Sequence, residues 1–263
     1  MAAILAASST FAHARGFNPL NALTDDPAEP EPAEIDPAVA TGVHWRLMTD
    51  RGPVHVWTPA NYDRETAITV VFVHGYNTDV DNAWTDYRLP EQFARSGVNA
   101  MFIACGAPSA SNRPMVWASL SGLLATVKAG IAQPLPWGQV VAVGHSAAYR
   151  TLVLWLPNPA LRTLVLLDAA YGELDQFQRW ARDETYHRLI NVASDTIPDS
   201  NLMHAFLPGT RRVDGLPANG WPDDVRTSRL LYVRTTVGHM PMITGGIALP
   251  LVLRALPSSA VHP

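Results

Sequence analysis

The chain is poor in cysteine, in lysine and in charged residues generally. Its single cysteine, Cys105, excludes an intrachain disulfide and any metal site built from several thiolates. No apolar run reaches the length that a bilayer-spanning helix needs. The formal net charge of −4 and the pI near 6.1 give no basic footprint, so we expect no nucleic-acid partner. Apolar residues are abundant instead: 48% of the 263 residues are hydrophobic, enough for a large buried core.

The first 40 residues differ in composition from the rest. Residues 1–11 are small and apolar, and Ala12-His13-Ala14 fits an A-x-A cleavage site, which favours a periplasmic or secreted protein. No Lys or Arg precedes this run, which leaves a cytoplasmic location open as the alternative. Residues 16–40 are rich in Pro, Glu, Asp and Ala and are too polar to pack. We therefore predict a signal-like or Ala-rich tail and a disordered linker over residues 1–40, and one folded domain over residues 41–263.

An opening hairpin pattern is followed by alternating strand and helix patterns. Short β-branched apolar runs, typical of strands buried on both faces, alternate with stretches of helical periodicity. This predicts an α/β protein with one doubly wound, mostly parallel sheet of about eight strands and helices on both faces. The predicted strands cover residues 43–48, 54–57, 67–73, 98–104, 140–143, 161–167, 188–192 and 230–233. The predicted helices cover residues 82–96, 115–131, 149–156, 174–182 and 244–256, and residues 198–227 are predicted as a long loop.

One stretch carries a pattern that is typical of a nucleophile. A short apolar strand, residues 140–143, runs into Gly144-His145-Ser146-Ala147-Ala148, and a predicted helix follows at once. A serine at the apex of a tight strand–turn–helix is the context of the G-x-S-x-G nucleophile elbow. Ala148 stands where that pattern has its second glycine, and a methyl group is the smallest addition that close helix–strand packing has to accommodate. We therefore predict Ser146 as a nucleophile.

A serine nucleophile needs a base, and the base needs a group that orients it. His239 lies beyond the last predicted strand and is the candidate base. Two carboxylates lie between Ser146 and His239 at predicted strand ends, Asp168 and Asp195. Asp195 ends the second strand after the elbow strand and Asp168 ends the first, so both are candidates for the orienting acid. All four residues follow predicted strands, so we expect them at the carboxyl ends of the parallel strands, where ligands of such sheets bind.

Three short motifs give the chain a resemblance to the α/β-hydrolase superfamily. They are HGYN at residues 74–77, GHSAAY at residues 144–149 and DAAYG at residues 168–172, and the order Ser, Asp, His is that of the superfamily. The resemblance covers residues 41–263 as architecture and implies the α/β-hydrolase fold and a catalytic domain. It also implies an oxyanion hole made of the backbone N–H groups of Tyr76 and Ala147. It favours Asp195 as the acid, because the superfamily most often keeps its acid after the second strand beyond the elbow, and leaves Asp168 as the alternative.

The resemblance implies acyl transfer to water, with a carboxylic ester, small or polymeric, as the default substrate. An amidase or peptidase, a thioesterase and a non-catalytic binding protein of the same fold are the alternatives. This mechanism implies no cofactor. We also expect no metal site, because His187 and His204 lack metal-ligand spacing and no H-E-x-x-H motif occurs. We predict that His74 stabilises its loop and that His145 packs away from the elbow apex. The sequence does not indicate an oligomeric state.

Overall fold

The computed structural model describes residues 37–256. The predictions for the signal-like segment and for most of the linker therefore lie outside the described residues. The first described element is a short helix, α1 (Pro37–Ala40), at the end of the predicted linker. No helix among residues 37–256 combines the length and the apolar character that crossing a membrane requires.

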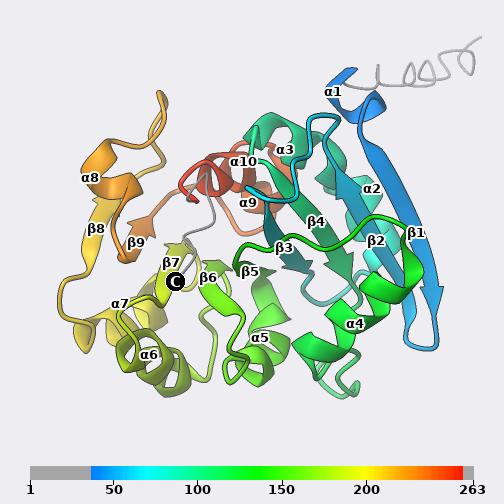
Figure 1. Cartoon of the computed structure of the whole chain (residues 1–263). Helices are drawn as coiled ribbons and strands as arrows, with labels where there is room; N and C mark the ends of the chain where they lie inside the picture. Colours follow the sequence, from blue (N-terminus) through cyan, green and yellow to red (C-terminus); the bar gives the residue numbers. More distant parts are fainter. Residues whose placement is uncertain (1–36, 257–263) are drawn as a thin grey trace, which may run out of the picture. The chain divides into compact units, whose positions relative to one another are not determined.

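A nine-stranded sheet organises the described residues, in the order β1-β2-β4-β3-β5-β6-β7-β9-β8 (Figure 1). β2 is antiparallel to both of its neighbours, and the strands from β4 to β8 in this order are all parallel. This confirms the predicted hairpin and the predicted mostly parallel sheet. The strands are β1 (Val43–Thr49), β2 (Gly52–Thr58), β3 (Ile68–Val73), β4 (Ala100–Cys105), β5 (Val140–His145), β6 (Leu161–Leu167), β7 (Arg188–Ala193), β8 (Arg211–Asp214) and β9 (Leu230–Arg234).

Alternate residues of the central strands belong to two separate hydrophobic clusters. On β3, Val71 and Val73 pack in one cluster, while Val70 and Phe72 pack in the other. The first cluster is covered by α4 (Leu120–Gly130), α5 (Tyr149–Trp155) and α6 (Leu174–Asp183). The second is covered by α2 (Val80–Asp86), α3 (Leu89–Ser96) and α10 (Ala248–Leu253). Helices therefore lie on both faces of the sheet, as predicted, which explains why the central strands are continuously apolar.

Three predicted helices differ from the observed ones in their bounds. The helix predicted over residues 82–96 is broken into α2 and α3, because Arg88 adopts a left-handed φ of 52° between them. The helix predicted over residues 115–131 begins only at Leu120, since Ser119 caps α4 by accepting the N–H of Gly122. The closing helix predicted over residues 244–256 is divided into α9 (Pro241–Thr244) and α10, with Gly246 at a positive φ between them.

The stretch predicted as a loop over residues 198–227 is largely structured. It contains most of α7 (Ile197–Ala205), the edge strand β8 and α8 (Asp223–Arg226). β8 was not predicted, because its sequence, RRVD, is mostly polar and its residues are mostly exposed. An edge strand pairs on one side only and needs no continuous apolar run. The sheet consequently has nine strands rather than about eight.

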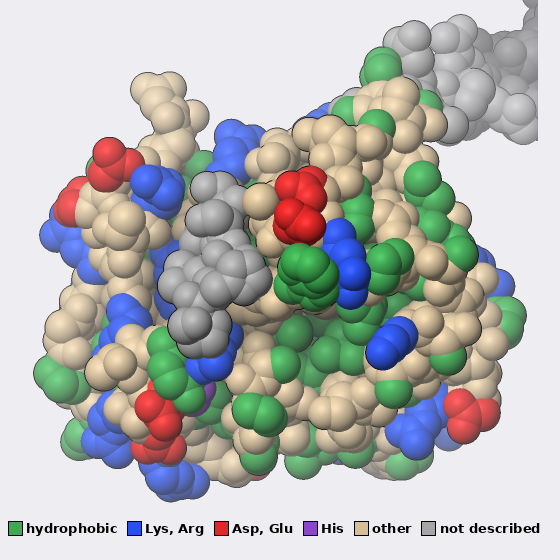
Figure 2. All heavy atoms as spheres, in the orientation of Figure 1, with side chains coloured by type: hydrophobic (Ala, Val, Ile, Leu, Met, Phe, Trp, Pro, Cys, Tyr) green, Lys and Arg blue, Asp and Glu red, His purple; other side chains and the backbone are tan. Residues whose placement is uncertain are grey.

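Charged side chains are mixed on the visible surface. On the face shown in Figure 2, basic and acidic side chains of the described residues lie interspersed, and apolar side chains gather near the centre of the view. A large field of one sign, which a nucleic-acid-binding face would present, is not a feature of this face.

Candidate active site

Ser146 lies in a strained turn directly after β5. β5 ends at His145, and Ser146–Ala148 form one turn of 3₁₀-helix that leads into α5. The φ of Ser146 is 59°, a left-handed conformation that costs a side-chain-bearing residue about 1–3 kcal/mol. A Cβ on Gly144 would lie 2.4 Å from Leu152 Cδ1 and 2.9 Å from the Ala148 methyl. A side chain at 144 would therefore overlap its neighbours, whereas the turn accommodates the alanine at 148.

The loop after β3 packs directly against this turn. A Cβ on Gly75 would lie 2.6 Å from Ser146 Cβ and 3.1 Å from its Oγ. His74 holds the loop: its Nε2 accepts the N–H of Ala107 at 3.0 Å, so its Nδ1 carries the proton and donates to Gly75 O at 2.7 Å. Burial lowers the pKa of His74, which agrees with a neutral ring. These bonds confirm His74 as a loop-stabilising residue.

The same loop presents the backbone of Tyr76 beside Ser146. The next residue, Asn77, has a left-handed φ of 63° and donates its N–H to Ser109 O at 3.0 Å. The N–H of Tyr76, by contrast, donates to no acceptor within residues 37–256. An available N–H next to the candidate nucleophile is what an oxyanion hole requires.

His239 is hydrogen-bonded to Asp168. His239 Nδ1 lies 2.7 Å from Asp168 Oδ2, and the Asp168 side chain is fully buried. Burial alone would raise the pKa of Asp168, but hydrogen bonds from His239, Ser194 and Thr196 outweigh it and hold that pKa well below its usual range. An ionised carboxylate only accepts hydrogen bonds, so His239 Nδ1 carries the proton and its Nε2 is free to act as a base.

Asp195, the carboxylate favoured from the sequence, does not make this bond. Its side chain is exposed, and its backbone N–H donates to Asp168 Oδ2 at 3.2 Å. The reason lies in the strand ends. Asp168 adopts a left-handed φ of 46° after β6, and the chain after β7 turns its N–H groups onto the Asp168 carboxylate. Both carboxylates therefore lie near His239, but only Asp168 is hydrogen-bonded to it. The DAAYG segment was the signal that pointed to Asp168.

Asp168, Asp195 and His239 could also be considered as metal ligands. One ligand atom of each lies within 4.8 Å of the others. Asp168, however, already accepts five hydrogen bonds, from three backbone N–H groups, the Thr196 hydroxyl and His239. A carboxylate has about four lone-pair sites, so a metal ion would have to displace existing donors.

His145 connects the elbow to the loop that carries His239. It is buried, its Nε2 donates to His239 O at 3.0 Å, and the two imidazole rings lie 4.5 Å apart. Burial, followed by the nearby His239, lowers the pKa of His145 to about 4, so the ring is neutral near pH 7. Sequence reasoning recognised the packing of His145 but missed its hydrogen bond to the backbone of the candidate base.

Tyr171 flanks His239. Its hydroxyl lies 3.3 Å from His239 Nδ1, and its ring meets the imidazole edge-on at 5.9 Å. Burial and the neighbouring carboxylates of Asp168 and Asp195 raise the pKa of Tyr171 to about 12, so it is a neutral phenol. In the sequence, Tyr171 stands out only as part of the DAAYG motif.

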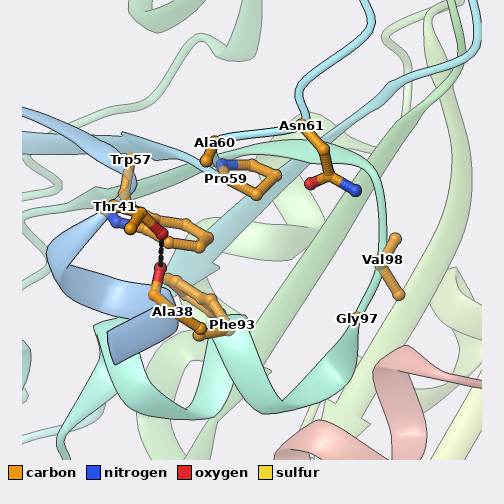
Figure 3. A pocket seen from close by; sticks show the side chains of 10 residues that line it. Ala38, Thr41, Trp57, Pro59, Ala60, Asn61, Phe93, Gly97 and Val98 are labelled. Atoms are coloured by element: carbon orange, nitrogen blue, oxygen red, sulfur yellow. Dashed lines mark hydrogen bonds between the residues drawn. The ribbon is translucent and has the colours of Figure 1, made fainter. Parts of the chain in front are cut away.

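A separate pocket lies between α1, the end of β2 and α3 (Figure 3). Its lining residues all belong to the N-terminal part of the domain. Trp57 and Phe93 supply its aromatic walls, and its volume is about 180 Å³. None of its lining residues is acidic, basic or a histidine, and none belongs to the strand ends around Ser146. This pocket lacks the groups that acyl transfer needs, so the candidate active site is the one around Ser146.

No protein-family model and no curated protein sequence matches the chain. Solved structures do resemble it. A serine-to-alanine mutant of the feruloyl esterase module from Clostridium thermocellum, complexed with sinapinate, is 12% identical with a TM-score of 0.55, covering 84% of this chain and 91% of that one. The fluorophosphonate-binding serine hydrolase F of Staphylococcus aureus is 9% identical with a TM-score of 0.52, covering 82% of this chain and 98% of that one.

A third similar structure is the S-formylglutathione hydrolase of Staphylococcus aureus. It is 12% identical with a TM-score of 0.52, and the match covers 82% of this chain and 96% of that one. At these identities the likeness concerns the arrangement of strands and helices rather than the side chains. The nine-stranded, mostly parallel sheet with helices on both faces has the α/β-hydrolase fold that these hydrolases and esterases share.

Proposed function

We propose that the chain is a serine hydrolase that cleaves a carboxylic ester through an acyl-enzyme on Ser146. The observation that carries the proposal is the 2.7 Å hydrogen bond between the ionised, fully buried Asp168 and His239 Nδ1. It fixes the imidazole tautomer with a free Nε2. His145, the neighbour of Ser146, binds the backbone of His239, which keeps that imidazole at the elbow.

In the proposed reaction, His239 Nε2 takes the proton of Ser146 Oγ while Oγ attacks the ester carbonyl. Asp168 stabilises the resulting imidazolium and does not itself take up the proton. The alcohol leaves with the proton from His239, and a water molecule activated by the same imidazole hydrolyses the acyl-enzyme. No step requires a cofactor.

The carbonyl oxygen becomes an oxyanion during this attack, and we assign its two donors to the N–H groups of Ala147 and Tyr76. Two features support the assignment: the loop of Tyr76 contacts Ser146 through Gly75, and the Tyr76 N–H has no acceptor within residues 37–256. A donor of this kind contributes about 3 kcal/mol of transition-state stabilisation.

Esters are the default substrate class because, among the acyl compounds that these groups could cleave, an ester with a good alcohol leaving group is the least demanding to hydrolyse. The names of similar structures, a feruloyl esterase and an S-formylglutathione hydrolase, agree with ester chemistry in a broad sense. Amides and thioesters would use the same groups. We assign the activity to the predicted domain over residues 41–263, and export stays a prediction of residues 1–40.

Labelling with a neutral alkyl fluorophosphonate tests the proposal. We expect intact-mass analysis to show one adduct on the wild-type chain and none on Ser146→Ala, with hydrolysis of p-nitrophenyl butyrate lost in parallel. A folded wild-type chain that forms no adduct and hydrolyses no ester would instead support a non-catalytic binding protein. Comparison of p-nitrophenyl esters with the matching anilides and thioesters separates the three hydrolase alternatives.

A further inference from the structure

Arg150 is held against the loop that carries Tyr76, whose backbone N–H is the assigned oxyanion donor. It lies four residues after Ser146, in the first turn of α5. Its Nη1 donates to the hydroxyl of Tyr76 at 2.6 Å and to Ala110 O at 3.3 Å, and its guanidinium carbon lies 5.8 Å from the centre of the Tyr76 ring. The guanidinium is therefore fixed against the loop whose Gly75 touches Ser146.

Most of the hydrogen-bonding capacity of Arg150 is unused. A guanidinium has five N–H donors, yet only Nη1 bonds to the protein within residues 37–256. No carboxylate in this part of the chain lies within 4.0 Å of its nitrogens. Arg46, Arg211 and Arg234 each pair with an aspartate. Arg150 is half-buried, and a cation withdrawn from water gains from an anionic partner.

We propose that Arg150 binds an anionic group of the ester substrate, a carboxylate or a phosphate, beside the oxyanion hole. The inference rests on the proposed function and names the substrate class for it. The planar fork of a guanidinium matches both groups through paired N–H donors. Tyr76 connects the two parts of the site, because its hydroxyl orients the fork while its backbone N–H is the assigned oxyanion donor.

Matched substrate pairs test this role. On the acyl side, mono-p-nitrophenyl succinate is compared with its methyl-capped diester. On the alcohol side, 4-acetoxybenzoate is compared with methyl 4-acetoxybenzoate. For Arg150→Gln we expect the ratio of kcat/KM for the anionic over the neutral ester to fall about tenfold in one of the two pairs. Tyr76→Phe should give a smaller fall in the same pair, because it removes only the hydroxyl that orients the fork.

The control is Arg179→Gln. Arg179 is exposed on α6 and already pairs with Asp175, so its replacement should leave the ratio unchanged in both pairs. A fall of about threefold or more in either pair for Arg150→Gln supports the proposal. A smaller change in both pairs overturns it, even if overall activity drops, since Arg150 would then only brace the loop.

A binding measurement keeps this proposal separate from that of Ser146 catalysis. The ligand is the anionic ester of the pair that responds: monomethyl succinate for the acyl side, 4-acetoxybenzoate for the alcohol side. We expect calorimetry to show that it binds the Ser146→Ala variant and that Ser146→Ala/Arg150→Gln binds it more weakly, by about threefold or more. Equal binding, or none in either variant, overturns the anion site. Failure of the hydrolase proposal would appear independently, as absence of the fluorophosphonate adduct on the wild-type chain.

Discussion

The imidazole of His145 lies 4.5 Å from that of His239 and donates from Nε2 to the His239 carbonyl at 3.0 Å. Two consecutive residues, His145 and Ser146, therefore serve one site in different ways. Ser146 presents a hydroxyl at a strained turn, and His145 fixes the backbone of the proposed base. The tight turn after β5 therefore matters in two ways: it exposes the Ser146 hydroxyl, and it places the adjacent His145 ring against the backbone of His239.

Removal of the His145 donor should lower kcat. His145→Leu loses the bond to the His239 carbonyl, a loss of about 1 kcal/mol that corresponds to about fivefold in kcat for p-nitrophenyl butyrate. His145→Gln keeps an N–H donor at this position and should retain most of the activity. Equal losses in both variants would show that ring packing, rather than the hydrogen bond, positions His239.

The same residue predicts a pH dependence of stability. The pKa of His145 is lowered to about 4 in the folded chain, against an ordinary value of 6.5, so the unfolded chain binds the extra proton first as the pH falls. Stability from this group is present above pH 6.5 and declines as the pH falls from 6.5 towards 4. His204, whose pKa is also lowered to about 4, contributes in the same direction.

Urea unfolding of the wild type and of His145→Gln over this pH range checks the prediction. We expect the free energy of unfolding to fall less steeply with decreasing pH in the variant. A residual slope should remain from His204 and from the other histidines whose pKa burial lowers, His44, His55 and His74. An identical slope in both proteins would contradict the assignment of a buried, neutral His145.

The two aspartates at the strand ends should differ in their effect on catalysis. Asp168→Asn removes the acceptor that fixes the His239 tautomer and should reduce kcat about a thousandfold or more. Asp195→Asn keeps the backbone N–H that donates to Asp168 and should reduce kcat about tenfold at most, because only an exposed charge is lost. Turnover of p-nitrophenyl butyrate, with circular dichroism as a check of folding, compares the two. A larger loss for Asp195→Asn would reverse the assignment.

The contact between Gly75 and Ser146 should make glycine necessary for activity. In Gly75→Ala the new methyl group would lie 2.6 Å from Ser146 Cβ, so the loop that carries the Tyr76 N–H has to move. We expect kcat/KM to fall about a hundredfold, the loss typical of a missing oxyanion donor.

Gly106→Ala is the matched control, because its methyl group would meet only Val116 Cγ1 at an ordinary 3.5 Å. Its activity should stay close to that of the wild type. An active Gly75→Ala protein would show that the loop does not need its observed position against the elbow.

Gly144 and Leu152 should be energetically coupled. A methyl group at 144 would lie 2.4 Å from Leu152 Cδ1, an overlap expected to cost about 1–3 kcal/mol in Gly144→Ala. Leu152→Ala alone leaves a cavity and should cost about 2–5 kcal/mol. In the double variant the shortened side chain at 152 relieves the overlap, so the combined loss should be smaller than the sum. Additive losses in denaturant unfolding would contradict this packing.

The strands buried on both faces could be predicted from the sequence, because burial on both faces requires a short run of apolar residues within the strand itself. β3 and β5 consist mostly of apolar residues, and each is buried along its whole length. β8 could not be predicted in the same way, since an edge strand pairs only with β9 and its residues face solvent. The break between α2 and α3 depends on one left-handed residue, Arg88, that helical periodicity does not reveal.

By itself, the sequence determined the class of fold, the strand–turn–helix around Ser146 and the candidate base His239, because each depends on the order of residues along the chain. Only the tertiary structure decided which carboxylate meets that base. Asp168 and Asp195 both follow strands of the same sheet edge, so their positions in the sequence are nearly equivalent. The left-handed turn at Asp168 and the N–H groups of residues 194–196 that converge on it separate the two, and such convergence exists only in three dimensions.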